Sequence, residues 1–287
     1  MAIVGHIQAI WRYPVKSMAG EQLTSSMVSP QGLLGDRGWA LRDEQAKEIR
    51  GAKKMPQLML CAATYLEEPT ERHIPAVAMR LSDGTALKST DPEVGARLSA
   101  FLGRTVTLWP QQPESATEHY RRGAPDNPDM QVELRELFGR TPDEPIPDLS
   151  AFPREIFEFT SPLGTYFDAF PLHFLTTASL DTLARQNPSA QWDARRFRPN
   201  FVIATDAGQH GLVEIDWCGR SLKIGGLTLQ CNLPTPRCVM TTQALPGLDK
   251  DPSVLRTIVR DAAQNLGVYG VVQTPGRVAI GDTVELI

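Results

Sequence analysis

The sequence is poor in cysteine and carries no excess of positive charge. It has four cysteines in 287 residues, too few for a disulfide framework, and none of them forms a CxxC pair. Their spacing argues against a zinc knuckle or a four-cysteine iron–sulfur cluster. The net charge of −4 argues against a nucleic-acid binder. We therefore expect a protein that works in a reduced, cytoplasmic setting and binds no nucleic acid.

Long hydrophobic runs and nucleotide-binding motifs are also missing. No stretch is apolar over the length needed to cross a bilayer, so we expect no membrane span. Arg12 and Lys16 interrupt the N-terminus before the apolar segment of a signal peptide can form. The chain has no Walker motif and no GxGxxG, and its five histidines lack a metal-binding spacing such as HExxH. These absences argue against the common nucleotide-dependent and zinc-dependent enzyme classes.

What the sequence does contain is a series of short strand-like runs. Turns with glycine or proline separate them in both halves of the chain, which is typical of sandwiches and barrels. Capping residues predict a few helices between them. The predicted strands are 3–11, 23–29, 38–42, 58–65, 77–81, 105–109, 172–176, 201–205, 213–217, 221–224, 227–231, 269–273, 276–280 and 284–287, and the predicted helices are 92–102, 178–186 and 251–266. The predicted fold class is mainly β with α (α+β).

A change in composition divides the chain. Between residues 110 and 155, proline, aspartate, glutamate and arginine are frequent, which is typical of a surface linker or an insertion. We therefore predict an N-terminal β-barrel-like domain in 1–110, a linker or insertion in 111–155 with one short helix near 132–138, and a second β-rich domain with packed helices in 156–287.

The stretch from Cys231 to Thr242 carries the most chemistry. Two prolines stiffen its middle, a β-type run at 238–243 leaves it, and Arg237 directly precedes Cys238. A fixed positive charge beside a thiol favours the thiolate, which is the form that binds soft metals. Cys238 is therefore a candidate metal ligand. A buried apolar cysteine in a turn between strands is the alternative, and on these residues alone it is the more common case.

Several separated turns carry cations or hydroxyl groups. They are Lys16-Ser17, Gly35-Asp36-Arg37-Gly38, Thr176-Thr177-Ala178-Ser179 and Arg195-Arg196-Phe197-Arg198-Pro199-Asn200. In a chain of net negative charge such clusters suggest an anionic ligand, and the N-terminus of a helix is a natural anion site. Ordinary surface turns, an exposed ion pair and plain helix capping are the alternatives.

Taken together, these motifs occur in the order found in one protein family. The segments are YPVKS at 13–17, GDR at 35–37, RFRPN at 196–200 and RCVMTT at 237–242. The sequence resembles the MOSC-domain proteins with a MOSC N-terminal β-barrel domain, a family that includes the mitochondrial amidoxime-reducing component and the YcbX-type proteins. The resemblance covers nearly the whole chain and is weakest in 111–155. The resemblance implies that 1–110 is the MOSC N-terminal β-barrel domain and that 156–287 is a β-barrel MOSC domain with packed helices.

The resemblance implies that a molybdenum cofactor, Mo-molybdopterin, is held between the two domains. The cysteine of the RCxxTT motif would ligate molybdenum and act in catalysis, which makes Cys238 the metal-binding and catalytic residue. The implied cofactor contacts are Lys16, Ser17, Arg37, Thr176, Thr177, Arg198, Asn200, Arg237 and Cys238.

The resemblance also implies an activity, which is two-electron reduction of small N-hydroxylated or N-oxide substrates. Electrons would come from a separate donor protein with flavin, haem or an iron–sulfur centre. One alternative is a molybdenum-cofactor or sulfur carrier, a sulfurtransferase that holds a persulfide on Cys238 and works with a PLP-dependent desulfurase. A non-catalytic binding protein is a third hypothesis.

Three departures from the family pattern stand out. Relatives often read CxRC, whereas six residues separate Cys231 from Cys238 here, which predicts a longer loop and a different substrate pocket. The usual TTVDP is replaced by TTQALP at 241–246. No cysteine cluster follows Cys238, so we expect no ferredoxin domain. Whether Cys231 and Cys238 form a reversible disulfide stays open.

Overall fold

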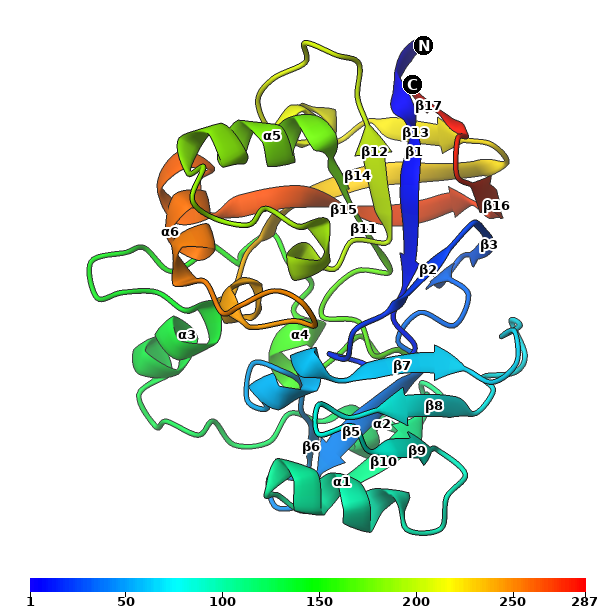
Figure 1. Cartoon of the computed structure of the whole chain (residues 1–287), viewed down its shortest axis with the longest axis vertical. Coiled ribbons are helices and arrows are strands. Elements are labelled where there is room, and N and C mark those ends of the chain that lie inside the picture. Colours follow the sequence, from blue (N-terminus) through cyan, green and yellow to red (C-terminus); the bar gives the residue numbers. More distant parts are fainter.

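The computed structural model describes residues 1–287 as two β-rich bodies with helices packed against them (Figure 1). The first elements are β1 (Ala2–Arg12), β2 (Glu21–Leu23), β3 (Ser25–Ser29), β4 (Gly32–Leu33), β5 (Trp39–Asp43), β6 (Glu48–Ile49), η1 (Pro56–Leu60), β7 (Ala62–Tyr65), β8 (Val77–Arg80), β9 (Ala86–Lys88), α1 (Val94–Leu102) and β10 (Val106–Pro110). The helices α2 (Thr117–Tyr120), α3 (Met130–Phe138) and α4 (Glu155–Glu158) follow. The last elements are β11 (Leu172–Thr176), α5 (Thr177–Gln186), η2 (Ala194–Phe197), β12 (Phe201–Ala204), η3 (Val213–Trp217), β13 (Ser221–Ile224), β14 (Leu227–Pro236), η4 (Val239–Thr242), α6 (Pro252–Asp261), β15 (Asn265–Thr274), β16 (Gly276–Ala279) and β17 (Thr283–Leu286). The predicted class, mainly β with α, is confirmed.

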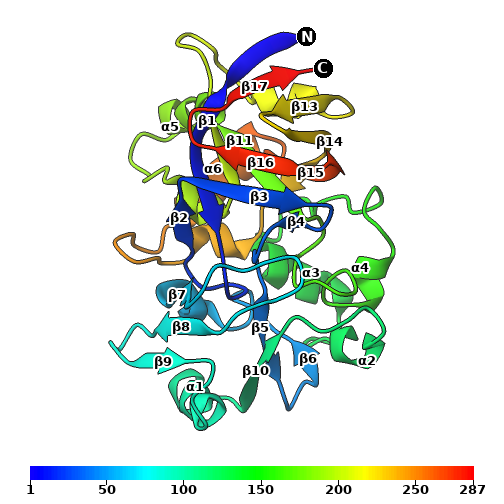
Figure 2. The same ribbon diagram turned by 90° about the vertical axis from the view of Figure 1, so that its right-hand side faces the viewer.

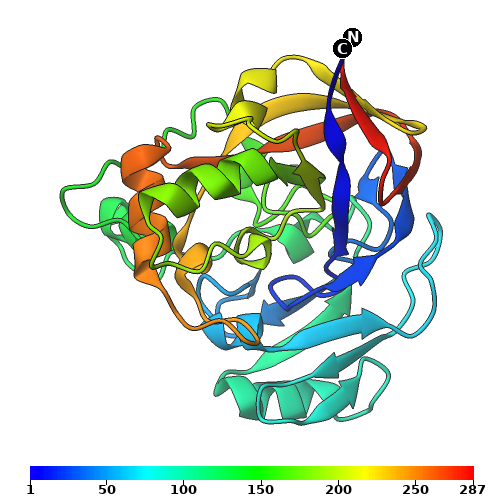
Figure 3. The ribbon, with the colours of Figure 1, turned by 45° about the horizontal axis from the view of Figure 1, so that its top comes forward.

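The larger body is a closed seven-stranded β-barrel. Its strands follow the order β12-β11-β15-β14-β13-β17-β1, and β1 pairs with β12 to close the ring. The short strand β2 extends the sheet beyond β1. Because β1 also pairs with β17, the first and last strands are neighbours and the two termini lie side by side (Figure 3).

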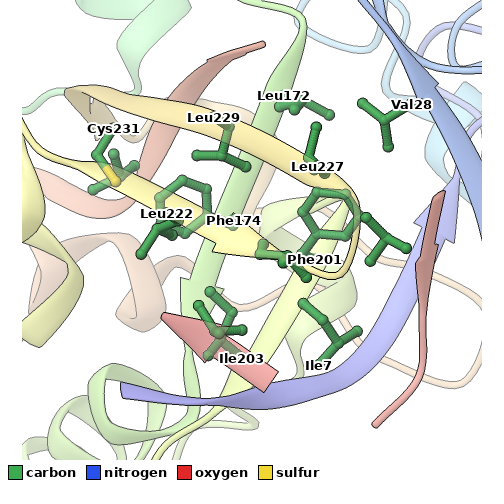
Figure 4. Close-up of a cluster of buried hydrophobic side chains, with 14 of the residues drawn as sticks. Ile7, Val28, Leu172, Phe174, Phe201, Ile203, Leu222, Leu227, Leu229 and Cys231 are labelled. Atoms are coloured by element: carbon green, nitrogen blue, oxygen red, sulfur yellow. The ribbon is translucent and has the colours of Figure 1, made fainter. Parts of the chain in front are cut away.

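Apolar side chains fill the barrel (Figure 4). Ile7, Phe174 and Phe201 have no exposed surface, since alternate residues of a strand point to the same face of the sheet. Gly5 permits the closure of the ring. Its φ is +152°, and a Cβ at this position would lie 2.1 Å from the carbonyl oxygen of Ala204 in β12. A larger residue would therefore push β1 away from its partner.

Two helices cover one side of the barrel. α5 and α6 contact each other. Leu183 of α5 and Ile258 of α6 are buried in one cluster with Leu175 of β11. As predicted, Asp251 caps α6 by accepting a hydrogen bond from a backbone N–H, and Pro252 takes its first position. No helix in the molecule has both the length and the apolar character needed to cross a membrane.

Some helix ends differ from the prediction. The side chain that caps α5 belongs to Thr176 rather than Thr177. α6 ends at Asp261, because the chain enters β15 at residue 265 and the pairing with β14 replaces further helical hydrogen bonds. α1 begins at Val94 without a side-chain cap, since the carboxylate of Asp91 accepts instead from the amide of Lys88 at 2.7 Å.

Parts of three predicted β runs are 3-10 helices. Residues 213–217 form η3, the run 58–65 begins in η1, and residues 239–242 form η4. In η3 the buried side chains are Glu214 and Trp217. A spacing of three places them on one side of a 3-10 turn, whereas a strand would bury alternate residues.

The smaller body contains the three-stranded sheets β10-β5-β6 and β7-β8-β9 together with α1. Its core includes Leu41, Leu58 and Met59, none of which is exposed. β3 and β4 do not join it, because they pair with β16 beside the barrel (Figure 2). The predicted boundaries at 110 and 155 stay a prediction.

The predicted linker, residues 111–155, contacts both bodies. On one side Asp126 forms an ion pair with Arg50 of the smaller body at 2.6 Å. On the other, Arg140 donates to the carbonyl oxygen of Arg237 beyond β14 at 2.9 Å. The segment thus lies against the junction where the candidate site is formed.

Candidate functional site

One cavity of about 150 Å³ is lined by the barrel, the smaller body and the linker together. It brings seven of the nine predicted site residues into one place. They are Lys16, Ser17, Arg37, Arg198, Asn200, Arg237 and Cys238. Residues that are far apart in the sequence therefore share a single wall, as the separated basic turns suggested.

β14 delivers Cys238 to this cavity. The strand continues to Pro236, beyond its predicted end at 231, and its pairing with β15 becomes irregular around Pro234. Cys238 directly precedes η4, and its side chain is half-buried. The thiol is therefore a cavity-lining group and not a fully enclosed core residue.

Hydrogen bonds fix the peptide that joins Arg237 to Cys238. The amide of Arg237 donates to the carbonyl of Gln264 at 2.9 Å, and its own carbonyl accepts from Nη2 of Arg140 at 2.9 Å. The other N–H groups of Arg140 donate to Oε1 of Gln264 at 2.9 Å and to the carbonyl of Phe138 at 2.6 Å. A linker arginine outside every motif therefore holds the backbone beside the thiol.

The side chain of Arg237 is buried but incompletely bonded. Nη2 donates to the carbonyl of Phe197 at 2.8 Å and Nη1 to Nε2 of His173 at 3.4 Å, while Nε has no partner. Burial and then the charge of Arg237 hold the pKa of His173 well below its usual value. His173 is therefore uncharged at neutral pH, and its Nε2 accepts from Arg237.

Arg198 is a second buried guanidinium with a free N–H. It stacks over the ring of Tyr13 at 4.1 Å and donates from Nη1 to the carbonyl of Met18 at 2.6 Å, while Nη2 has no partner. Burial lowers its pKa to about 10, and the charge of Arg37 adds to this effect. A buried cation without a carboxylate is the environment that a bound anion would complete.

Arg37 lies in a network with Asp36 and Asn200. The predicted Asp36–Arg37 ion pair is present, but its side chains are 0% and 14% exposed, so it is not a surface contact. Asp36 also accepts from Nδ2 of Asn200 at 2.9 Å and from the amide of Tyr13 at 2.8 Å. Asn200 thereby joins the loop before β12 to the turn that carries Arg37.

Lys16 and Ser17 follow β1 on the same wall. Nζ of Lys16 donates to Oδ1 of Asp168 and to the carbonyl of Tyr166, both at 2.7 Å. The hydroxyl oxygen of Ser17 accepts from the amide of Ala52 at 2.9 Å. The YPVKS segment is therefore a tightly bonded turn whose ammonium group faces an acidic side chain.

Backbone strain is concentrated at this wall. Ser17, Arg37 and Arg198 have φ values of 72°, 53° and 54°, and the chain has only six non-glycine residues with positive φ. Each such residue costs about 1–3 kcal/mol and persists where the surrounding structure enforces it, often at functional sites. The three residues share the cavity, which supports a functional reading of the basic turns.

The sequence analysis missed Asp168 and Lys53, which also line the cavity. Nζ of Lys53 lies 3.9 Å from Oδ2 of Asp168. Burial tends to raise the pKa of Asp168, but the charges of Lys16 and Lys53 outweigh it and hold that pKa well below its usual range. Neither residue belongs to a motif, and a single acid in an aromatic stretch gives no local sign of its role.

Thr176 and Thr177 do not line the cavity. The hydroxyl of Thr176 donates to Glu214 at 2.6 Å and its oxygen caps α5 by accepting from the amide of Ser179 at 3.2 Å. Thr177 accepts from the amide of Thr205 at 3.1 Å. Plain helix capping therefore accounts for this segment, and its contact with a cofactor has no support from the structure.

Cys231 lies in the barrel core and not in the cavity. It has no exposed surface, and burial raises its pKa to about 12. Both Cys231 and Cys238 are free thiols. The two sulfurs therefore sit in different environments, and the structure does not support the disulfide that the sequence left open.

A further group of lining residues is apolar and largely aromatic. The rings of Phe152, Phe170 and Tyr269 lie with their centres 5.0 to 6.1 Å apart. Phe138 and Ile156 add to this apolar part of the wall. The cavity thus combines a cationic part, which carries the thiol, with an apolar part to which the linker contributes Phe138 and Phe152.

Two family models match the chain. Residues 4–109 match the MOSC N-terminal beta barrel domain and residues 164–285 match the MOSC domain. Together they leave mainly the linker unmatched.

Similar proteins extend over nearly the whole chain. Mitochondrial amidoxime-reducing component 1 of Mus musculus is 24% identical over 99% of this chain and 83% of its own length. Mitochondrial amidoxime reducing component 2 of Bos taurus is 25% identical over 98% of this chain and 83% of its own length. The solved structure of the YUAD protein from Bacillus subtilis aligns with a TM-score of 0.44 at 11% identity, over 98% of this chain and 94% of that one. On the two domain matches, which confirm the expectation raised by its motifs, the chain belongs to the MOSC-domain proteins that carry a MOSC N-terminal β-barrel domain.

Proposed function

We propose that this protein is a molybdenum-cofactor-dependent oxidoreductase that removes oxygen from N-hydroxylated small molecules. The observation that carries the proposal is the set of residues around the Cys238 thiol. The thiol shares one cavity with Arg198 and Arg237, two buried guanidinium groups that each retain an N–H without a partner. The relatives named as amidoxime-reducing components support the substrate class.

The cavity residues fit the proposed cofactor. Molybdopterin ends in a phosphate, which would satisfy the free N–H groups of Arg198 and Arg237 in a buried place where unpartnered donors are costly. Lys16 and Arg37 would add further cationic contacts from the smaller body's side. Cys238 would supply the soft thiolate that molybdenum favours. The donor set therefore has both a cationic part for the anion and a sulfur for the metal.

When bound, the cofactor supplies the two-electron chemistry that cleaves an N–O bond. The chain's own part includes the handling of protons that this cleavage consumes. Asp168 stays ionised beside Lys16 and Lys53, and the protons would be held at the Nζ atoms of these lysines. Lys53 is one-third exposed, so its ammonium group exchanges protons with water. The apolar part of the wall would limit the access of water to the substrate.

Substitution of Cys238 tests the proposal. In protein produced together with molybdenum cofactor, and with electrons from reduced methyl viologen, we expect Cys238→Ala to abolish the reduction of benzamidoxime. Cys218→Ala is the matched control, because Cys218 is partly buried and does not line the cavity. It should keep full activity. Full activity in Cys238→Ala would refute the role of the thiol.

The same preparation separates the alternatives. Molybdenum analysis and the fluorescence of the oxidised pterin measure the bound cofactor, and mass labelling measures a persulfide. Cofactor without persulfide supports the reductase. A persulfide on Cys238 without molybdenum would favour the sulfur carrier and its PLP-dependent desulfurase partner. If the reductase holds, a separate donor protein supplies the electrons in the cell.

A further inference from the structure

The linker supplies part of the cavity's apolar lining. Phe138, Leu149 and Phe152 come from it, and Ile156 follows directly. This is the part of the chain that neither family model covers. The thiol of Cys238 lies within the residues that match the MOSC domain, as do Phe170 and Tyr269.

Phe152 belongs to an aromatic group that lines the cavity. Its centre lies 5.9 Å from that of Phe170 in a tilted arrangement and 6.1 Å from that of Tyr269 in an edge-to-face one. Phe152 is only half-buried. Aromatic rings favour offset and edge contacts at such distances, so a flat ring that enters the cavity gains contacts with all three.

A second cavity adjoins this group. It has a volume of about 270 Å³ and lies between the linker and the strands β14 and β15. Phe152 and Pro236 line both cavities, and Pro147, Leu233 and Pro234 give the second one an apolar part beside Asp148, Gln264 and Asn265. Apolar surface therefore continues beyond the first cavity. A substrate larger than a single ring could extend along it.

The charge of the wall restricts what enters. The cationic lining residues of the first cavity are Lys16, Arg37, Lys53, Arg196, Arg198 and Arg237, and Asp168 is the one acidic residue among its lining. A bound anionic cofactor would offset part of this excess, but a cationic substrate would still approach a positive surface. An uncharged body avoids this repulsion and gains the apolar contacts.

We propose that the linker is the specificity-determining part of the site and that it selects N-hydroxylated substrates with a flat, uncharged aromatic body. The body packs against Phe152, Phe170 and Tyr269, and the N–OH group faces Cys238. The placement of the N–OH group rests on the proposed function. The packing of the ring does not, because it needs only the apolar wall.

Phe152→Ser tests this selection against a matched control in the next helix. Phe157 is 57% exposed and does not line the cavity, so Phe157→Ser makes the same chemical change outside the site. Benzamidoxime and acetamidoxime carry the same reacting group on a phenyl ring or a methyl group. We expect Phe152→Ser to lower kcat/KM for benzamidoxime roughly tenfold and to change that for acetamidoxime by less than about twofold. Phe157→Ser should change neither.

A binding measurement covers the case in which turnover fails. In cofactor-free protein, saturation transfer to the ring protons of benzamidoxime should be strong in the unchanged protein and in Phe157→Ser, and weak in Phe152→Ser. Thermal unfolding checks that the variants are folded. Phe152→Leu keeps an apolar side chain, so its saturation transfer should lie between that of the unchanged protein and that of Phe152→Ser.

The outcomes separate the two proposals. Equal losses for both amidoximes in Phe152→Ser, or unchanged transfer to the ring, would overturn the linker's role. If ring binding depends on Phe152 but the cofactor-loaded protein reduces neither amidoxime, the proposed function fails and the aromatic subsite stands.

Discussion

Arg50 and Arg198 are 6% and 8% exposed, yet they lie in opposite electrostatic surroundings. The guanidinium of Arg50, in the smaller body, lies 2.6 Å from carboxylate oxygens of both Glu48 and Asp126 and 3.7 Å from one of Asp43. Arg198, at the cavity, has no carboxylate partner and keeps an N–H without an acceptor. One region neutralises its buried cation with the chain's own acids, and the other does not.

Under the proposed function, this difference separates arginines that stabilise the fold from arginines that would bind the cofactor. A buried charge costs several kcal/mol unless it is paired and hydrogen-bonded. The acids around Arg50 offset that cost within the folded chain. At Arg198 the cost remains, which is a common trade of stability for function. Substitution of the two arginines should therefore change the free energy of unfolding in opposite directions.

Removal of the paired arginine should have the largest effect on stability. Arg50→Met leaves Glu48, which is 8% exposed, without its cation and removes one of the two cations that pair with Asp126 of the linker, the other being Lys54. Loss of one partner of a buried ion pair lowers the free energy of unfolding by about 3–5 kcal/mol. Urea denaturation at neutral pH measures it. Arg260→Met is the control, because Arg260 is exposed and its pair with Asp261 should contribute nothing measurable. Similar stability of the two variants would contradict the role assigned to Arg50.

Removal of the unpaired arginine should act in the other direction. Arg198→Gln takes away a buried charge that has no counter-ion and keeps a donor for the carbonyl of Met18. We expect the cofactor-free protein to gain about 1–2 kcal/mol of unfolding free energy, because burial disfavours the charged form. Pterin fluorescence should show that the variant retains less cofactor than the unchanged protein. A loss of stability as large as that of Arg50→Met would place Arg198 among the structural arginines and end the distinction.

The sequence predicted the residues whose chemistry is visible locally. Cys238 follows a cation and two prolines, and Arg198 stands in a cluster of arginines, so short motifs made both candidates, and the order of the motifs along the chain then favoured them. The fold class followed from many short runs between turns. In each case neighbours in the sequence carry the information, and the structure needed only to bring the marked turns together.

What the sequence could not predict depends on partners far along the chain. Lys16 and Asp168 are 152 residues apart, and nothing near either one indicates the other. Arg140 and Phe152 belong to a segment without motifs, and their roles arise only when the linker packs against the end of β14. Thr176 is the reverse case, because the motif order assigned it to the cofactor, whereas its side chain caps α5, bonds Glu214 and does not line the cavity.

Two buried carboxylates extend the comparison from cations to acids. Asp43 and Glu214 both have no exposed surface. Burial tends to raise the pKa of Asp43, but its bond to Arg104 and the backbone N–H groups it accepts from lower that pKa below the ordinary 3.8. Glu214 accepts from the hydroxyl groups of Thr176 and Ser179 and has no cation partner, and burial raises its pKa above the ordinary 4.5.

The two acids should therefore make stability depend on pH in opposite ways. Asp43 contributes stability above pH 3.8, which is lost as the pH falls through its lower folded pKa. Glu214 contributes fully below pH 4.5, and its contribution is lost as the pH rises through its higher folded pKa. The ionised form of Glu214 has no cation beside it, so the cost of its charge grows as the pH rises above its folded pKa.

Glu214→Gln should remove this smaller, pH-dependent cost. We expect its unfolding free energy to exceed that of the unchanged protein by about 1 kcal/mol at pH 8 and to differ little at pH 4, because the neutral amide resembles the protonated acid. Urea denaturation at the two pH values measures it, and Asp216→Asn, at an exposed position of η3, should show no such difference. Equal destabilisation of Glu214→Gln at both values would mean that the geometry of its hydrogen bonds to Thr176 and Ser179, and not the uncompensated charge, governs this site. In that case the contrast between paired and unpaired groups would hold for the arginines alone.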